Sequence, residues 1–237
     1  GTRVDAVIRT PGGAVTYEGE AEIPGVPGTA APVTLRFRDV AGSQTGTLFP
    51  TRARAEDVQG IRVTLIDGAM PMMLVPAAAL GVAVTATPES LDADKPMLAR
   101  LESLRREAGA RMGLGDVADS VIPKPCLIGP GTAGAHITAR YFTPHDCHRA
   151  MAVTGGITLA AACRTPGTVA RDATGADPGE TVRIAHPSGV MEVPIGLESG
   201  EVAWAATLRT ARRILEGTLL IPRAVWPGHS RLAQAAE

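Results

Sequence analysis

The sequence of 237 residues has few aromatic side chains and almost no net charge. Three Phe, two Tyr and two Trp are too few for the exposed aromatic platforms on which single-stranded nucleic acids stack. The 23 Lys plus Arg and 24 Asp plus Glu leave a net charge of −1, which offers no electrostatic surface to a nucleic acid backbone or an anionic membrane. We therefore expect no nucleic acid partner.

Long apolar runs and nucleotide-binding motifs are also absent from the sequence. The longest nearly uncharged stretch, residues 70–84, contains Pro71 and Pro76 and is too short to span a hydrocarbon core of about 30 Å. There is no GxGxxG, Walker A, GxSxG or HExxH pattern. The sequence therefore gives no support for a dinucleotide-binding enzyme, a nucleotide-binding enzyme or a serine hydrolase. We expect no membrane-spanning helix.

The cysteine content favours a reducing compartment. Cys126, Cys147 and Cys163 make an odd and sparse set, unlike the dense spacing of a disulfide framework. The cytoplasm is therefore the expected location.

Alternation of apolar and polar residues predicts a mostly antiparallel sheet. Strands are expected near residues 4–8, 15–17, 33–37, 61–65, 121–128, 135–142, 181–185, 190–197, 201–209 and 214–221. The turn at residues 11–13 would join the first two in a hairpin. A strand end is expected at residues 67–71, because Pro71 interrupts a hydrogen-bonded ladder at its own position.

Two helices of different character interrupt this pattern. Residues 92–112 carry apolar side chains at three- and four-residue steps, which predicts an amphipathic helix. A second helix is expected from near residue 147 to residue 163. Residues 151–163 are small and apolar on every side, which predicts that this helix is buried on all sides, as it would be inside a wrapped sheet. Gly155 and Gly156 within it favour close approach of neighbouring groups. The fold class predicted is therefore α+β.

The densest polar cluster is Thr143, His145, Asp146, Cys147 and His148, which would lie at the start of the buried helix. Free N–H groups and the positive dipole end favour a substrate carboxylate there and would lower the pKa of a thiol. The alternatives are a buried thiol that acts as a small apolar side chain and a zinc site of His145, Cys147 and His148, for which no further ligand pair completes the set.

Lys124 is the second candidate, because Pro123 and Pro125 stiffen the chain on both sides of it and would aim the cation in a fixed direction. The alternative is an ordinary solvated lysine on the surface.

Several segments together resemble one family of isomerases. Residues 2–20, 66–71, 112–117, 120–125, 141–155 and 166–168 are similar to the PrpF-type family, which includes 2-methylaconitate cis-trans isomerase, 3-methylitaconate isomerase and 4-oxalomesaconate tautomerase. The string Phe-Thr-Pro-His-Asp-Cys-His at residues 142–148 looks most like the oxalomesaconate branch.

The resemblance implies a diaminopimelate-epimerase-like fold, in which rolled antiparallel sheets surround a central buried helix in each of two pseudo-symmetric domains. Residues 1–70 would form the remaining part of an incomplete first domain, rejoined by residues 212–225, and residues 71–211 would form the second domain around the helix at 147–163. The family's Cys-Gly-Asn motif and upstream lysine have no match in this sequence, so we expect further chain upstream.

The resemblance also implies a cofactor-independent reaction, without metal, that moves a proton within an unsaturated tricarboxylate. A 4-oxalomesaconate tautomerase is the first expectation; 3-methylitaconate or 2-methylaconitate isomerisation, or a non-catalytic fragment, are the alternatives. Cys147 would be the pseudo-symmetric counterpart of the family cysteine and a candidate for catalysis. The remaining candidates would bind a di- or tricarboxylate: Thr143, His145, Asp146, His148, Lys124, Asp67 and Met70. The resemblance allows a homodimer.

Overall fold

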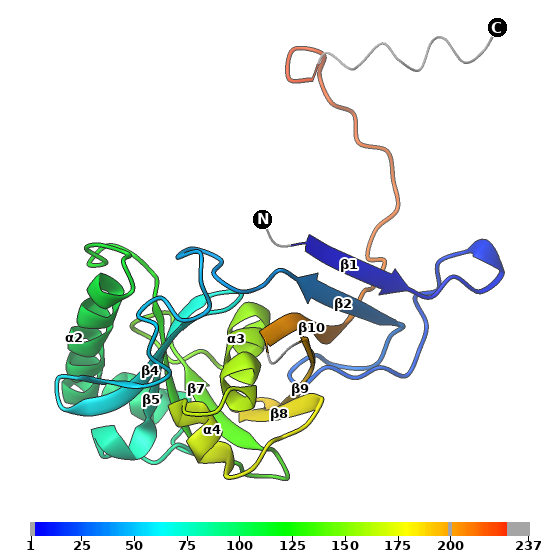
Figure 1. The fold of residues 1–237 in the computed structure, drawn as a ribbon. Helices are drawn as coiled ribbons and strands as arrows, with labels where there is room; N and C mark the ends of the chain where they lie inside the picture. The colour runs from blue at the N-terminus through cyan, green and yellow to red at the C-terminus, as the bar shows by residue number, and fades with distance from the viewer. Residues whose placement is uncertain (1–2, 199–200, 227–237) are drawn as a thin grey trace, which may run out of the picture.

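The computed structural model describes residues 3–198 and 201–226, and its centre is a mixed sheet of ten strands in the order β1-β2-β10-β9-β8-β7-β6-β5-β4-β3 (Figure 1). The strands are β1 (Arg3–Ile8), β2 (Pro32–Arg38), β3 (Glu56–Val58), β4 (Ile61–Asp67), β5 (Pro71–Pro76), β6 (Lys124–Pro130), β7 (Ile137–Tyr141), β8 (Thr181–His186), β9 (Gly189–Glu198) and β10 (Glu201–Thr210). The helices are η1 (Pro11–Gly13), η2 (Ala77–Leu80), α1 (Pro88–Ala93), α2 (Lys95–Arg111), α3 (Val153–Arg164) and α4 (Val169–Thr174).

The pairs β5–β6 and β7–β8 are parallel, and the other neighbouring strands pair antiparallel. A parallel pair needs a crossover connection, usually a helical one. The first crossover contains α1 and α2, and the second contains α3 and α4. Both predicted helices thus lie in the connections that parallel pairing requires.

The two crossovers cover opposite faces of the sheet. Alternate strand residues such as Ile66, Met72 and Cys126 pack with α3 in one apolar cluster. Their neighbours Leu65 and Met73 pack with α2 in the other. This is the period-two pleat of a strand buried on both faces, which reads in sequence as a continuous apolar run.

The helix α3 is buried along its length, as its composition predicts. All of residues 155–163 are buried. Gly155 lies against the ring of Tyr141: a Cβ atom on Gly155 would lie 2.6 Å from Cε2 of that ring. The prediction that a glycine here permits close approach is confirmed.

The start of this helix was predicted incorrectly. The helix begins at Val153, after the extended residue Ala152, and not near residue 147. Residues 142 and 147 instead form an isolated β-bridge. A bridge needs extended backbone, so the polar cluster at residues 143–148 belongs to a loop between β7 and α3 and does not begin the helix.

Two predicted strands do not form. Residues 14–20 are irregular, and β1 pairs with β2 across the sheet rather than with residues 15–17. Residues 211–221 are irregular and exposed, and in Figure 1 the chain after β10 leaves the sheet. Alternation alone makes a strand only where a neighbouring strand supplies hydrogen bonds. Residues 212–225 therefore do not rejoin the first elements of the chain.

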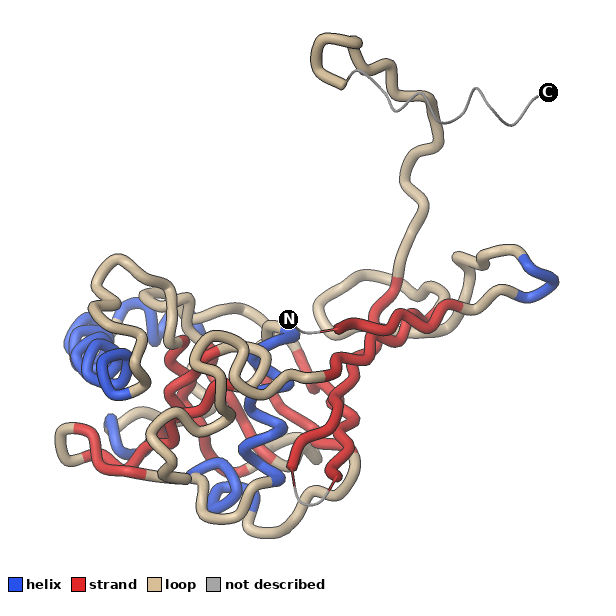
Figure 2. Tube along the Cα trace, turned by 45° about the horizontal axis from the view of Figure 1, so that its top comes forward, coloured by secondary structure: helices blue, strands red, loops and turns tan. Residues whose placement is uncertain are grey.

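The two ends of the sheet differ in how far other parts of the chain cover them. Every residue of β1 is exposed, and Figure 2 shows this end of the sheet projecting away from the α-helices. At the other end, the edge strand β3 pairs with β4, and the turn of the hairpin formed by β4 and β5 contains residue 70. The division of the chain into two domains near that residue stays a prediction.

Candidate active site

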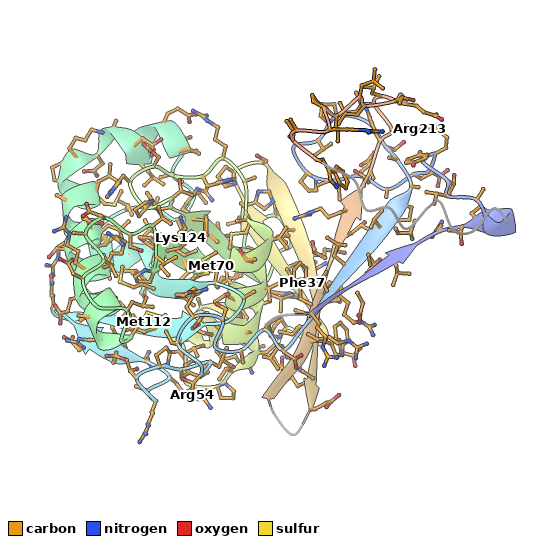
Figure 3. The ribbon with its side chains drawn as sticks, turned by 90° about the horizontal axis from the view of Figure 1, so that it is seen from above. Phe37, Arg54, Met70, Met112, Lys124 and Arg213 are labelled. Carbon is orange, nitrogen blue, oxygen red and sulfur yellow. The ribbon has the colours of Figure 1, made fainter. Side chains whose placement is uncertain are left out.

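The candidate residues gather at one edge of the sheet. Because β5 and β6 are parallel, their first residues lie at the same edge as the last residues of their antiparallel neighbours β4 and β7. The β4–β5 turn, Lys124 and the loop at 142–148 meet there, and Met70 and Lys124 are labelled in Figure 3. The strand end predicted at residues 67–71 is confirmed.

Lys124 is the first residue of β6, in register with Met72 of β5. Only 9% of it is exposed, and none of the described carboxylates lies within 4.0 Å of its ammonium group. Burial, and to a smaller extent the charge of Arg105, lower the pKa of Lys124. Lys124 is therefore not a solvated surface lysine but a nearly buried cation without a counter-ion among the described residues.

Arg105 of α2 holds the segment that leads to Lys124. Its side chain is fully buried. It donates hydrogen bonds to the carbonyl oxygens of Val117, Ser120 and Ile122 at 2.8, 3.0 and 3.1 Å and pairs with Glu102 through Nε and Nη2 at 2.6 and 2.8 Å. The sequence analysis did not identify Arg105 as a candidate. Its position next to Leu104, on the apolar side of an amphipathic helix, was a signal that its side chain could be buried.

The loop at 142–148 is tied to the strand that carries Lys124. The N–H of Phe142 donates to the carbonyl oxygen of Pro125 at 2.9 Å, and the N–H of His148 donates to that of Tyr141 at 2.7 Å. Within the loop, the N–H of Thr143 donates to the carbonyl oxygen of Asp146 at 3.0 Å. These bonds close a tight loop directly beside the start of β6.

Cys147 points into the apolar cluster beneath α2 and is 5% exposed. Its N–H donates to Oδ1 of Asp92 at 2.7 Å. Burial raises the pKa of its thiol to about 12, against the opposing charge of Arg140. The expectation of a lowered thiol pKa at a helix start is wrong here, because Cys147 lies six residues before Val153 and in apolar surroundings.

The other loop candidates are open to solvent. Thr143, His145, Asp146 and His148 are all exposed. Nδ1 of His145 lies 4.0 Å from Oε2 of Glu102. Nδ1 of His148 lies 2.9 Å from the carbonyl oxygen and 3.0 Å from the backbone nitrogen of Ala150, so this ring nitrogen is engaged by the backbone of Ala150.

Asp67 does not line an open site, contrary to the sequence-based expectation. It is fully buried, and its carboxylate accepts hydrogen bonds from Ser43 Oγ at 2.6 Å, the N–H of Gln44 at 2.8 Å, and the N–H and hydroxyl of Thr45 at 2.7 and 2.9 Å. A carboxylate satisfied in this way holds the loop at 43–45 and has no capacity left for a ligand.

Met70 is fixed against α3 through its backbone. Its N–H lies 3.2 Å and its carbonyl oxygen 3.1 Å from Oγ1 of Thr158. Gly68, in the same turn, packs so closely on Thr158 that a Cβ atom would lie 2.7 Å from this hydroxyl oxygen. Thr158 was not predicted as part of the site. It fixes the turn that carries Met70 relative to the helix.

Neither a metal cluster nor a membrane span is found in the part of the chain that the structure describes. No group of three or more His, Cys, Asp or Glu residues there could hold a metal ion. None of the described helices combines the length and apolar character needed to cross a bilayer.

The fold resembles that of a known isomerase. The crystal structure of methylitaconate-delta-isomerase superimposes with a TM-score of 0.85 at 28% sequence identity, covering 96% of this chain and 65% of the other. The fold is the diaminopimelate-epimerase-like fold expected from the sequence.

The family described as PrpF protein matches residues 1–222, and the chain belongs to this family. YbhH of Escherichia coli (strain K12) is 46% identical over 224 residues, which are 94% of this chain and 64% of that protein. The 4-oxalomesaconate tautomerase of Pseudomonas putida (strain KT2440) is 40% identical over 225 residues, which are 94% and 62%. The chain thus spans less than two thirds of the length of these relatives.

Proposed function

We propose that the complete protein containing this chain is a cofactor-independent isomerase or tautomerase that moves a proton within an unsaturated tricarboxylate. The observation that carries the proposal is Lys124, a nearly buried ammonium group without a carboxylate partner among the described residues. A buried cation is costly unless something neutralises it. A substrate carboxylate would do so.

The reaction class places two demands on the protein. A group must take a proton from carbon next to a carboxylate or carbonyl and return one at the other end of the allylic system. Donors already in place must also stabilise the negative charge that develops on oxygen. In our proposal Lys124 meets the second demand, and the exposed groups of Thr143, His145 and His148 hold further carboxylate oxygens.

Proton transfer needs a group beyond those that bind the carboxylates. Cys147 is the candidate in this chain, but its thiol is buried and its pKa is raised to about 12, which makes the thiolate scarce at neutral pH. Lys124 with its lowered pKa is better suited to bind and to polarise. The complete protein would need a base beyond these two residues, and the greater length of the relatives leaves room for one.

The substrate we favour is 4-oxalomesaconate. The tautomerase named for it is 40% identical to this chain, whereas the solved isomerase named for methylitaconate is 28% identical. A 3-methylitaconate or 2-methylaconitate isomerase is the alternative within the family. The binding partner we propose is therefore a small carboxylate. We also propose that the protein is located in the cytoplasm. A homodimer is the assembly we propose to test.

The test is proton exchange in deuterated water with the complete polypeptide that contains this chain. We expect deuterium incorporation and isomerisation with 4-oxalomesaconate, and slower turnover of 2-methylaconitate and 3-methylitaconate. Exchange with one of the other two substrates alone would move the assignment to that substrate. Absence of exchange with all three would overturn the isomerase proposal and leave a binding role.

Lys124→Met and Lys95→Met form a matched pair of variants for this assay. Lys95 is exposed and its Nζ donates to the carbonyl oxygen of Asp92 at 2.8 Å. We expect Lys124→Met to lower exchange by about 100-fold, the effect of removing one donor to a developing oxyanion, and Lys95→Met to keep the wild-type rate. Equal rates in the two variants would remove Lys124 from the site.

A further inference from the structure

We propose that Arg209 and His186 form a carboxylate-binding subsite beside the start of α3. The inference rests on the proposed function, because it assigns one carboxylate of the substrate to these two side chains. Both line a cavity of about 870 Å³, whose wall also includes Met151 and Met191. Cavities that bind small molecules in proteins are typically about 300–1,000 Å³.

The pleat of the strands directs both side chains to the α3 side of the sheet. Successive residues of a strand alternate between faces. Ile184, in the apolar cluster around α3, lies two residues before His186, and Ala205, in the same cluster, lies four residues before Arg209. Met191 of β9 belongs to that cluster as well, and its Sδ atom lies 2.8 Å from where a Cβ atom on Gly156 of α3 would be.

Arg209 has spare capacity for an anion. Its side chain donates from Nη1 to the carbonyl oxygen of Leu208 at 2.9 Å, and no carboxylate of the described residues forms an ion pair with it. The side chain is partly buried, and burial lowers its pKa. A partly desolvated guanidinium with free donors binds a carboxylate in a bidentate manner better than an ammonium group does.

The neutral side chain of His186 can act as a hydrogen-bond donor. The N–H of Ser188 donates to its Nδ1 at 3.2 Å, which leaves Nε2 as the protonated nitrogen of the neutral ring. Burial, with smaller effects of Arg140 and His148, lowers its pKa. The neutral ring can therefore donate one hydrogen bond to a carboxylate oxygen in the cavity that Arg209 also lines.

The acidic residues around the cavity do not neutralise this pair. Glu22 and Glu192 contribute to the wall, and both are exposed to water, which screens their charge. In addition, Glu192 alternates with Met191 and Val193, so its side chain belongs to the face of β9 opposite α3.

The cavity adjoins the proposed site along the chain. Ala150 and Met151 form part of its wall and follow the loop at 142–148 after one intervening residue, Arg149. The hydroxyl of Ser188, in the turn after His186, donates to the carbonyl oxygen of Arg149. The loop and the cavity therefore lie at the same edge of the sheet.

The test is the affinity of the complete polypeptide for tricarballylate, a saturated tricarboxylate that cannot isomerise, measured by titration calorimetry together with KM in the exchange assay. We expect Arg209→Gln to weaken tricarballylate binding about 10- to 100-fold, as for loss of a charge-assisted hydrogen bond, and Arg209→Lys to recover part of the affinity. KM should rise by more than kcat falls. Arg183→Gln, at an exposed arginine on the other face of β8, should bind as wild type does.

The outcomes separate this inference from the proposed function. Wild-type exchange with unchanged tricarballylate affinity in Arg209→Gln would overturn the subsite and leave the isomerase proposal intact. Absence of both exchange and tricarballylate binding in the wild type would overturn both proposals. If Arg209→Gln fails to fold, His186→Gln replaces it: a loss of affinity of about 3- to 10-fold is expected, and wild-type affinity would overturn the subsite.

Discussion

The guanidinium of Arg105 donates a hydrogen bond of 3.1 Å to the carbonyl oxygen of Ile122, two residues before Lys124. Arg105 thereby connects α2 to the segment that leads into β6, and its positive charge lowers the pKa of Lys124. It serves as a positioning residue for the site, because it fixes the path of the segment from Val117 to Ile122 that leads into the strand.

Replacement of Arg105 by Met should destabilise the fold strongly. The substitution removes the Arg105 donor from three carbonyl oxygens and two of the three hydrogen bonds that the carboxylate of Glu102 accepts, leaving only the one from Arg106. Breaking a buried ion pair on one side typically costs about 3–5 kcal/mol. Chemical denaturation should show this loss, whereas Arg106→Gln, at the exposed partner of the same glutamate, should leave the unfolding midpoint unchanged. Equal midpoints for the two variants would contradict the assigned role.

Thr158→Val should loosen the turn that carries Met70. The hydroxyl contacts both the N–H and the carbonyl oxygen of Met70, and valine keeps the shape while removing both bonds. An unsatisfied buried backbone group costs about 1–3 kcal/mol. Thr158→Ser, which retains the hydroxyl, is the control, and it should keep most of the slow amide hydrogen exchange at Met70. Slow exchange at Met70 in the valine variant would argue against this anchor.

The cysteines should react slowly with thiol reagents in the folded protein. Burial raises the pKa of Cys147 to about 12 and raises the pKa values of Cys126 and Cys163 even further. Since the thiolate is the reactive form, titration with a disulfide reagent at about pH 8 should show little reaction before unfolding and three thiols in denaturant. Rapid modification of Cys147 in the native state would contradict its burial.

Lys124→Met should raise stability at neutral pH while it removes substrate binding. The folded-state pKa of Lys124 is depressed, so between this pKa and the ordinary lysine value the unfolded chain binds more protons and stability rises with pH. Below the folded-state pKa the protein carries the full cost of the buried charge. The stabilising effect of Lys124→Met should therefore be present at about pH 7 and diminish above the ordinary lysine pKa of about 10.4. Chemical denaturation of the wild type and of Lys124→Met across this pH range measures the difference in their free energies of unfolding. A difference that does not change with pH would exclude the titration of Lys124 as its cause.

The 237-residue chain by itself should associate in solution. Leu215 and Leu220, after β10, are 85% and 86% exposed, and the exposed strand β1 adds Val7, which is 62% exposed. Contiguous exposed apolar surface favours association. Sedimentation should show species that grow with concentration, and removal of residues 212–237 should reduce them. A monodisperse monomer that melts cooperatively would count against this prediction.

The local pattern of the sequence predicted the two longer helices. The amphipathic helix expected at 92–112 corresponds to α2, which begins at Lys95 after the short helix α1, and the all-apolar segment ending at residue 163 corresponds to the buried helix α3. A helix with one apolar face is buried on that face, and a helix that is apolar on every side is buried on every side. The family was also recognisable from the sequence, through strings whose order and spacing exceed chance.

Tertiary structure decided what local pattern could not. Residues 214–221 alternate as a strand does, yet they have no partner strand among the described residues. Asp67 looked free at a strand end and is satisfied by residues more than twenty positions away. Cys147 was expected at the start of the buried helix α3, but it lies before that helix and packs in the apolar cluster under α2. Hydrogen-bond partners, burial and the resulting pKa values depend on which distant segments pack together, and no short stretch of sequence contains that information.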